Sequence, residues 1–350
     1  MHYFNISKTN DDRQFYRSNE IYSDSTIVGK IEKELAQRGQ TYETAVSILN
    51  QLFKKRRLLP NADSETPQFE LEAEPHLYKL LASVNKQEPI HLILPGFPAK
   101  SPNRNKTLGP LPDLAEKHAL ENLQSLCDSI KDVYSPGATI TICSDGRVFA
   151  DLVQIPDEDV SAYGSYLRNY AKQQYQGLFE FFDLDDVFEK SYCFDIMREE
   201  LLILYGESIV NLRRRCNEEK EAKAMYLGIT RFIFEDYSGI EPFKSGSKTS
   251  IQKIARLIAY RVIQRSNAWT RLIEDRFYNA IRLSIHPQFR ISKKIGVYLG
   301  DTNGDSWLTP WHSVAVKRNG NIVFQKRTDA ERDSMLAYED GRPSHFEKID

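Results

Sequence analysis

A loop rich in cations follows a short apolar run near residue 90. Between Glu88 and Asp113 the chain has no acidic residue, and the loop behind the run at 90–94 carries polar side chains that include Lys100, Ser101, Arg104 and Lys106. Ligands of open α/β sheets bind beyond the carboxyl ends of strands, and a phosphate is held by several charge-assisted hydrogen bonds. The loop is therefore a candidate phosphate site, and a solvated basic loop is the equal alternative.

A second acid-free stretch lies between Glu241 and Glu274 and contains seven basic residues. On a helical wheel at about 100° per residue, Arg261 and Arg265 fall inside the apolar stripe, one turn apart. A buried guanidinium needs an anionic partner. That partner is either a ligand phosphate or a carboxylate from a distant part of the chain, and the pattern leaves both open.

Several side chains could transfer protons, and they are Asp145, Glu235, His286 and His312. Asp145 stands in a turn directly after an apolar run, and Glu235 begins an acidic pair at the end of another. Neighbouring acids that differ in burial separate into acid and base roles, and histidine titrates near neutral pH. Helix capping, surface charge and a core histidine are the structural alternatives.

Familiar cofactor and metal patterns are absent from the sequence. The seven histidines stand alone, no Cys-x-x-Cys occurs among the four cysteines, and there is no Gly-x-Gly-x-x-Gly, Walker-type or Gly-x-Ser-x-Gly motif. We therefore expect no preformed metal site and no nucleotide cofactor.

Charge and hydropathy restrict the partners and the compartment. Lys and Arg number 47 against 49 Asp and Glu, a formal net charge of −2, so no broad field attracts nucleic acid or anionic lipid. No leader-like N-terminus and no apolar run of about 18 residues is found, which argues against secretion and membrane insertion. We expect a cytoplasmic protein with reduced cysteines.

The elements that must position these side chains alternate between strands and helices. The run at 90–94, the amphipathic helix predicted at 113–133 and the run at 138–143 indicate a parallel βαβ unit. Upstream, 26–57 reads as two helices broken at Gly39, and 60–75 as a linker.

The second half of the chain is mostly helical in pattern. Residues 160–236 read as mostly helical, 251–283 as one long helix, and 294–299 as a strand. Asn319-Gly320 between two apolar runs predicts a β-hairpin. We predict an α/β fold: a Rossmann-like core with a mainly parallel sheet, a helical N-terminal region (1–85), an α/β catalytic domain (86–330) that ends in the hairpin, and a tail (331–350).

Several separated segments resemble the isocyanide synthases of the pyoverdine/dityrosine biosynthesis family. They include LPGFPAKSPNRNKTLGPLPDLAEKHAL (94–120), YSPGATITICSDGRVFADL (134–152), YLGITRFIFED (226–236), RSNAWTRLIEDRF (265–277), RLSIHPQ (282–288) and WLTPWHSVAV (307–316). They occur in the family's order and span about two thirds of the chain. The resemblance is specific for the family and not for one substrate.

The resemblance implies a cofactor-independent, lyase-like enzyme that forms a C–N bond. The α-amino group of an aromatic amino acid, tyrosine in preference to tryptophan, would become an isocyanide whose carbon comes from C2 of ribulose 5-phosphate. Imine formation, phosphate loss and C–C cleavage would follow one another. The expected partners are these two small molecules and a downstream oxygenase or tailoring enzyme that acts on the isonitrile, with no nucleic acid and no membrane.

The resemblance also suggests roles for the residues singled out above. The phosphate would be held by Lys100, Ser101, Arg104, Lys106, Arg261 and Arg265, and at least one base would come from Asp145, Glu235, His286 and His312. Lys100 could instead be catalytic by forming a Schiff base with the ketone. The aromatic side chain would stack on Trp269, Tyr298 or Trp311, although aromatic residues are more often part of the core.

Two other functions fit the same residues. One is an enzyme that forms an N-formyl group or another amide on tyrosine, with a different carbon donor. The other is a non-enzymatic module that binds phosphate or nucleic acid through the basic stretch at 244–271, with an affinity that falls steeply with salt.

Overall fold

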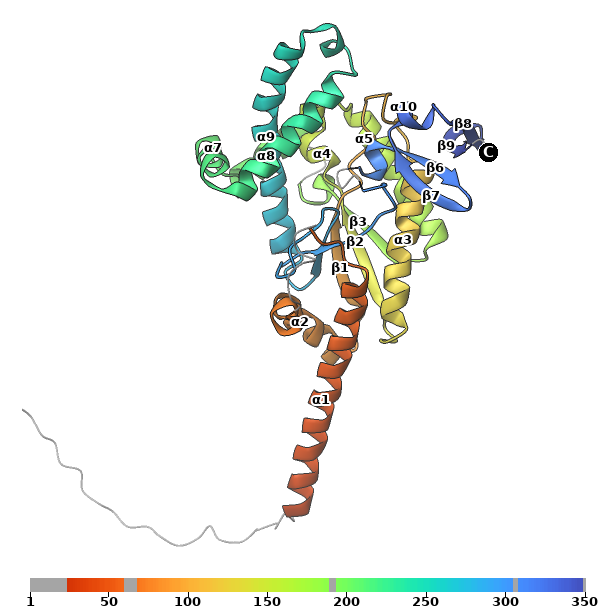
Figure 1. Ribbon diagram of the computed structural model, residues 1–350. Helices are drawn as coiled ribbons and strands as arrows, with labels where there is room; N and C mark the ends of the chain where they lie inside the picture. Colours follow the sequence, from red (N-terminus) through yellow and green to blue (C-terminus); the bar gives the residue numbers. More distant parts are fainter. Residues whose placement is uncertain (1–23, 60–67, 189–192, 305–307, 349–350) are drawn as a thin grey trace, which may run out of the picture.

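The centre of the protein is a five-stranded, all-parallel sheet (Figure 1). The computed structural model describes residues 24–59, 68–188, 193–304 and 308–348. The strands are β1 (Ile90–Pro95), β2 (Ala138–Cys143), β3 (Phe179–Phe182), β4 (Ile281–Ser284) and β5 (Ile295–Gly296), and they lie in the order β3-β2-β1-β4-β5. The strand order therefore reverses between β1 and β4, which is where open α/β sheets bind ligands.

The βαβ unit predicted from the sequence is confirmed. β1 leads through α3 (Leu114–Lys131) into β2, and the two strands pair in parallel from Ile90 opposite Ala138 to Pro95 opposite Cys143. Asp113 begins α3 with a capping box, in which its carboxylate accepts from the Ala115 amide.

Both faces of the sheet are buried. Leu92 and Leu94 of β1 point into the larger apolar core, which α1 (Asp24–Lys54), α2 (Phe69–Lys86), α3 and α5 (Asp157–Gln174) share. Ile93 points to the opposite face, into a smaller core that α6 (Phe194–Tyr205) and α9 (Lys248–Arg276) cover. Burial on both faces explains why these strands read as continuous apolar runs.

A helical hairpin extends beyond the carboxyl edge of the sheet (Figure 1). It consists of α8 (Lys220–Tyr237) and α9, with α7 (Ile209–Glu218) against both helices. At its base lie the short helices α4 (Gly146–Phe149) and η2 (Ala150–Val153), which follow β2. Two further 3-10 turns are η3 (Leu184–Asp186) and η4 (Phe243–Ser245).

The C-terminal part forms a second sheet in the order β7-β6-β9-β8. The predicted hairpin is confirmed as β6 (Val314–Arg318) and β7 (Asn321–Gln325), because Asn319 and Gly320 take the positive φ values of 49° and 81° that a tight turn requires. After α10 (Arg327–Ala330) come β8 (Ser334–Glu339) and β9 (Arg342–Lys348). β9 pairs in parallel with β6, so the segment that reads as a tail contributes half of this sheet.

Two secondary-structure predictions are wrong, and one is confirmed. α1 runs without a break through Gly39, because one solvent-exposed glycine costs a helix only about 1 kcal/mol. The mostly helical centre is confirmed by α5, α6, α7 and α8, and β3 is the short strand that interrupts it. The long helix ends at Arg276, and the chain then forms β4, whose side chains alternate between the two faces of the sheet.

In the part of the chain that the structure describes, no helix has both the length and the apolar character of a membrane span.

Candidate active site

A cavity of about 480 Å³ lies at the carboxyl edge of the parallel sheet, under the α8–α9 hairpin. Three of its lining residues follow directly on neighbouring strands: Gly96 after β1, Asp145 after β2 and His286 after β4. The cavity therefore occupies the point where the strand order reverses. Part of its wall comes from η5 (Pro310–His312), the turn that leads into β6.

One arm of the cavity is apolar. Phe149 and Val153 contribute from the short helices after β2, and the helical hairpin adds aliphatic side chains. The apolar lining includes Phe149, Val153, Ile155, Ile229, Val262, Ile263, Leu308 and Trp311. Trp311 is anchored at the bottom by its contacts with Phe97, at 5.2 Å between ring centroids, and with the backbone at Gly96.

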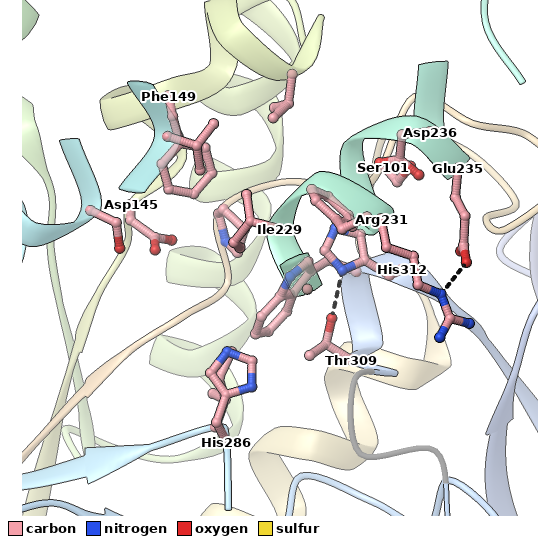
Figure 2. A pocket seen from close by; sticks show the side chains of 18 of the residues that line it. Ser101, Asp145, Phe149, Ile229, Arg231, Glu235, Asp236, His286, Thr309 and His312 are labelled. Carbon is pink, nitrogen blue, oxygen red and sulfur yellow. Dashed lines mark hydrogen bonds and ion pairs between the residues drawn. The ribbon is translucent and has the colours of Figure 1, made fainter. Parts of the chain in front are cut away.

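The other end of the cavity is charged, and its groups are paired. Lys106, which is buried, lies 2.5 Å from Asp236 Oδ1 and 3.5 Å from Glu235 Oε2. Ser101 donates a hydrogen bond to Asp236 Oδ2 at 3.0 Å. Arg231 contacts Glu235 at 3.0 Å (Figure 2). Lys326 contacts the same carboxylate at 3.1 Å. Three cations thus surround two carboxylates.

Burial and the neighbouring cations together separate the pKa values of these two neighbouring acids. Burial raises the pKa of Asp236 above its ordinary value, and the opposing effects of Lys106 and Ser101 do not cancel this. Burial also acts upward on the pKa of Glu235, but the hydrogen bond from Lys326 and the charges of Lys106 and Arg231 outweigh it and hold that pKa below the usual range. Glu235 is therefore a stable anion, and its deeper neighbour holds a proton more readily.

Two neutral histidines line the middle of the cavity (Figure 2). Burial lowers the pKa of His286 to about 4, assisted by the nearby charges of Arg57 and Lys294. Burial lowers the pKa of His312 well below its ordinary value, and Lys106 acts in the same direction. His312 Nδ1 is hydrogen-bonded to Thr309 Oγ1 at 3.0 Å. Both rings therefore act as neutral hydrogen-bonding groups at pH 7.

Asp145 lies in the cavity on the side of Phe149 (Figure 2). Its Oδ1 atom is buried and has no hydrogen-bond partner in the described part of the chain. Burial raises the pKa of Asp145 to about 7, and the charge of Arg282 opposes this rise only in part. This carboxyl is ready to exchange a proton near neutral pH.

Several predicted phosphate ligands lie away from the cavity. Lys100 is fully buried beside the cavity wall, where its ammonium contacts Asp113 and Glu116 at 2.9 Å each and donates to the Pro310 carbonyl. Arg104 is exposed on the loop. Of the predicted loop residues, Ser101 and Lys106 are the two that line the cavity.

The helical-wheel prediction for α9 is wrong for Arg261, which is exposed. The buried face of α9 follows the small residues Ala255 and Ala259, which the wheel left out, and Leu257 of the supposed stripe is 60% exposed. Arg265 is half-buried, but it lies 2.6 Å from the Asp151 carboxylate. A distant protein carboxylate is therefore the partner of this arginine.

Of the predicted aromatic ligands, Trp311 alone lines the cavity. Trp269 belongs to the core between α9 and the sheet and stacks on Phe182 at 5.6 Å. Tyr298 is 57% exposed and packs on the Arg57 guanidinium.

Most of the residues of the apolar arm were not predicted from the sequence. Two cations at the charged end of the cavity, Arg231 and Lys326, were also not predicted. Phe149 follows Asp145 within the same segment, so its position one helical turn later was a usable signal. Lys326 reaches Glu235 only because the second sheet and α8 meet at the cavity, which no local pattern reveals. Arg231 lies four residues before Glu235 on α8, so that pair was open to detection by its helical spacing. The described residues contain no group of three or more His, Cys, Asp or Glu side chains that could hold a metal ion.

Comparison with known proteins identifies the family. A family model described as "Pyoverdine/dityrosine biosynthesis protein" matches residues 80–337. The chain is 42% identical over 301 residues to L-tryptophan isonitrile synthase AmbI2 of Fischerella ambigua, covering 85% of this chain and 90% of that protein. It is 41% identical over 306 residues to an L-tyrosine isonitrile synthase of Pseudomonas aeruginosa, covering 85% of this chain and 92% of that one.

A solved structure agrees with these matches. The crystal structure of the PvcA protein from Pseudomonas aeruginosa superposes with a TM-score of 0.80 at 39% identity, covering 87% of this chain and 99% of that chain. The family that the sequence motifs resemble is thereby confirmed, and the chain belongs to the pyoverdine/dityrosine biosynthesis family.

Proposed function

We propose that this protein is an isonitrile synthase that converts the α-amino group of an aromatic L-amino acid into an isocyanide, with ribulose 5-phosphate as the carbon donor. The observation that carries the proposal is one cavity with an apolar arm, a charged end and neutral histidines between them, in a chain about 40% identical to tyrosine and tryptophan isonitrile synthases.

The apolar arm suits an aromatic side chain. Phe149, Val153, Ile155 and Val262 surround it with carbon and offer no charge. A cavity of about 480 Å³ has the size of ordinary small-molecule sites and holds two compact substrates together. Trp311 belongs to the apolar lining, with its ring centroid 6.2 Å from that of His312, and would contact the bound amino acid there.

The charged end suits the phosphate. Lys106, Lys326 and Arg231 carry three positive charges against the two carboxylates, and the Arg231 side chain is 76% exposed and free to turn towards a ligand. A dianion there would share the cations of Glu235. We do not assign the phosphate to Lys100, Arg104, Arg261 or Arg265, because none of them lines the cavity.

The reaction needs groups that move protons. The substrate ammonium must lose a proton before it attacks the C2 ketone, and the sugar hydroxyls must lose theirs for C–C cleavage. His286 and His312 lie between the two ends of the cavity and are neutral. Because His312 Nδ1 is bonded to Thr309, its Nε2 atom is the one that would hydrogen-bond a sugar oxygen. The Schiff-base role for Lys100 is not favoured, since its ammonium is held by two carboxylates.

Product analysis tests the proposal. We expect the purified protein, given ribulose 5-phosphate labelled with ¹³C at C2, to convert tyrosine, and less readily tryptophan, into a labelled product with one carbon more and two hydrogens fewer. A formamide in place of the isonitrile would favour an N-formylating enzyme. The absence of a labelled product with both amino acids, from folded protein, would overturn the proposal.

A further inference from the structure

Two buried polar groups without hydrogen-bond partners lie at the carboxyl edge of the sheet. Arg282 of β4 is 7% exposed, yet its Nε and Nη1 atoms have no hydrogen-bond partner within the described ranges. The Oδ1 atom of Asp145 is likewise buried and has no hydrogen-bond partner in the described chain. An unsatisfied buried donor or acceptor is costly, so each such atom calls for an explanation.

The sheet register shows how these two groups are related. Arg282 pairs with Ile93 of β1, which in turn pairs with Thr141 of β2. Arg282 therefore lies on the face of Ile93 and Cys143, the face covered by α9. Asp145 follows two residues after Cys143 and lines the cavity, whereas Arg282 does not line it. The guanidinium thus stands behind the cavity wall, on the far side from the substrates, and its charge acts on Asp145.

The other acids in the cavity are already engaged. Glu235 is held by Lys106, Lys326 and Arg231, and Asp236 by Lys106 and Ser101. Among the cavity carboxyls of the described chain, Asp145 is the one with no ion pair; its Oδ1 atom has no partner in another residue, and its carboxylate is hydrogen-bonded by its own backbone amide. A carboxylate that lines a cavity and has no cation paired with it matches a ligand ammonium.

We infer that Asp145 is the base that accepts the proton of the substrate's α-ammonium group, and that Arg282 is a positioning residue that favours its carboxylate form from behind the cavity. This inference rests on the proposed function. In balance, the ammonium, the ketone and the Asp145 carboxylate give the imine, one water molecule and the Asp145 carboxylic acid. The amine lone pair forms the C–N bond, and the ketone oxygen leaves as the water with two of the ammonium protons.

The titratable groups around Asp145 come from three neighbouring elements. β4 contributes Arg282, β2 contributes the Cys143 thiol, and α5 contributes the Tyr163 hydroxyl, which donates to Glu116. Burial raises the pKa values of both Cys143 and Tyr163 far above neutrality, so neither carries charge at pH 7. Arg282 is therefore the nearby ion whose removal changes the proton affinity of Asp145.

The first test is Asp145→Asn, with the exposed Asp128→Asn as the matched control. We expect kcat/KM for isonitrile formation to fall about 10²–10⁴-fold in the Asp145 variant, the usual effect of losing a general base, and to stay at the wild-type value in the control. The residual rate should rise with pH as the free amino acid loses its own proton. A wild-type rate in Asp145→Asn, or a residual rate that does not respond to pH, would overturn the inference.

The second test separates positioning from folding. In Arg282→Met the acidic limb of the kcat/KM profile should move upward by about one pH unit, because an opposite charge no longer favours the carboxylate. Arg282→Lys should restore the wild-type limb, and Arg276→Met, on the exposed end of α9, should leave it unchanged. A uniform loss of rate without a shift of the limb would assign Arg282 a structural role alone.

The outcomes keep the two proposals distinguishable. If the wild-type protein forms no isonitrile, the proposed function fails, and the link between Arg282 and Asp145 is then read from the titration of ¹³C-labelled aspartate carboxyls in wild type and Arg282→Met. An unchanged Asp145 titration in that measurement would overturn the positioning role as well. If the wild type forms isonitrile and Asp145→Asn does so equally well, only the present inference fails.

Discussion

Replacement of Asp145 by asparagine should stabilise the protein, and should do so only above a certain pH. Burial raises the pKa of this carboxyl from 3.8 to about 7. The folded protein therefore holds the proton more tightly than the unfolded chain does. As the pH rises through 3.8, the unfolded state loses its proton first, so the free energy of unfolding falls until the pH passes about 7 and then stays level. Asparagine does not ionise, and the variant lacks this fall.

The magnitude follows from the width of that window. The two pKa values differ by about 3 units, and each unit corresponds to about 1.4 kcal/mol, so the upper limit is about 4 kcal/mol. Because the side chain is partly exposed, solvent screens its charge and we expect about 2–4 kcal/mol. The variant and the wild type should have equal free energies of unfolding near pH 4. Near pH 8 the free energy of unfolding of the variant should be higher by this amount.

Urea unfolding followed by tryptophan fluorescence measures this difference. Wild type, Asp145→Asn and the exposed Asp128→Asn are compared at several pH values between about 4 and 8, with the slopes against urea checked for equality. Asp128→Asn should show the same dependence on pH as the wild type. A difference between wild type and Asp145→Asn that does not grow with pH would refute the claim that Asp145 is a buried, unpaired carboxyl. If Asp145→Asn makes the protein more stable and less active, this is the pattern expected when a functional residue is replaced.

Other substitutions test the neighbouring contacts. Lys106→Met leaves Asp236 buried without its cation, so unfolding free energy should fall by about 3–5 kcal/mol and the KM for ribulose 5-phosphate should rise; unchanged urea midpoints would contradict the ion pair. Gly146→Ala places a Cβ atom 2.0 Å from a carbonyl oxygen of the loop after β1 and should abolish soluble expression or activity, whereas Gly109→Ala, with open space around it, should behave as wild type. Trp311→Ala should lower unfolding free energy by about 3–5 kcal/mol and raise the KM for the amino acid; a variant with wild-type KM would place the aromatic substrate elsewhere.

The parallel core was predictable because its strongest signals are local. The apolar runs of β1 and β2 are closed by turn residues, and α3 between them begins with a capping aspartate. β3 and β4 were missed because each is only four residues long and adjoins a helical pattern. A four-residue strand becomes visible only through its neighbours in the sheet, since periodicity needs a longer window to separate a strand from a buried helix.

Within the site, the sequence patterns identified several residues that line the cavity, but they did not show which partners these side chains have. Asp145, His286 and His312 were singled out for their chemistry, and all three line the cavity. Lys100 has the same kind of local surroundings as Lys106, yet the fold directs the two ammonium groups to different partners. A cation's function depends on which carboxylates the fold brings to it, and those lie on other elements.

The two ends of the cavity differ in charge. At one end three cations and two carboxylates leave a net positive charge, and at the other a single carboxyl stands without a partner. A phosphate and an ammonium ion are attracted to opposite ends, while His286 and His312 line the stretch between them. Under the proposed function, a sugar phosphate held by its dianion would present its carbon chain towards an amine deprotonated at Asp145. The same polarity disfavours the reversed arrangement, because an ammonium ion would face Lys106 and a phosphate would face a buried carboxylate.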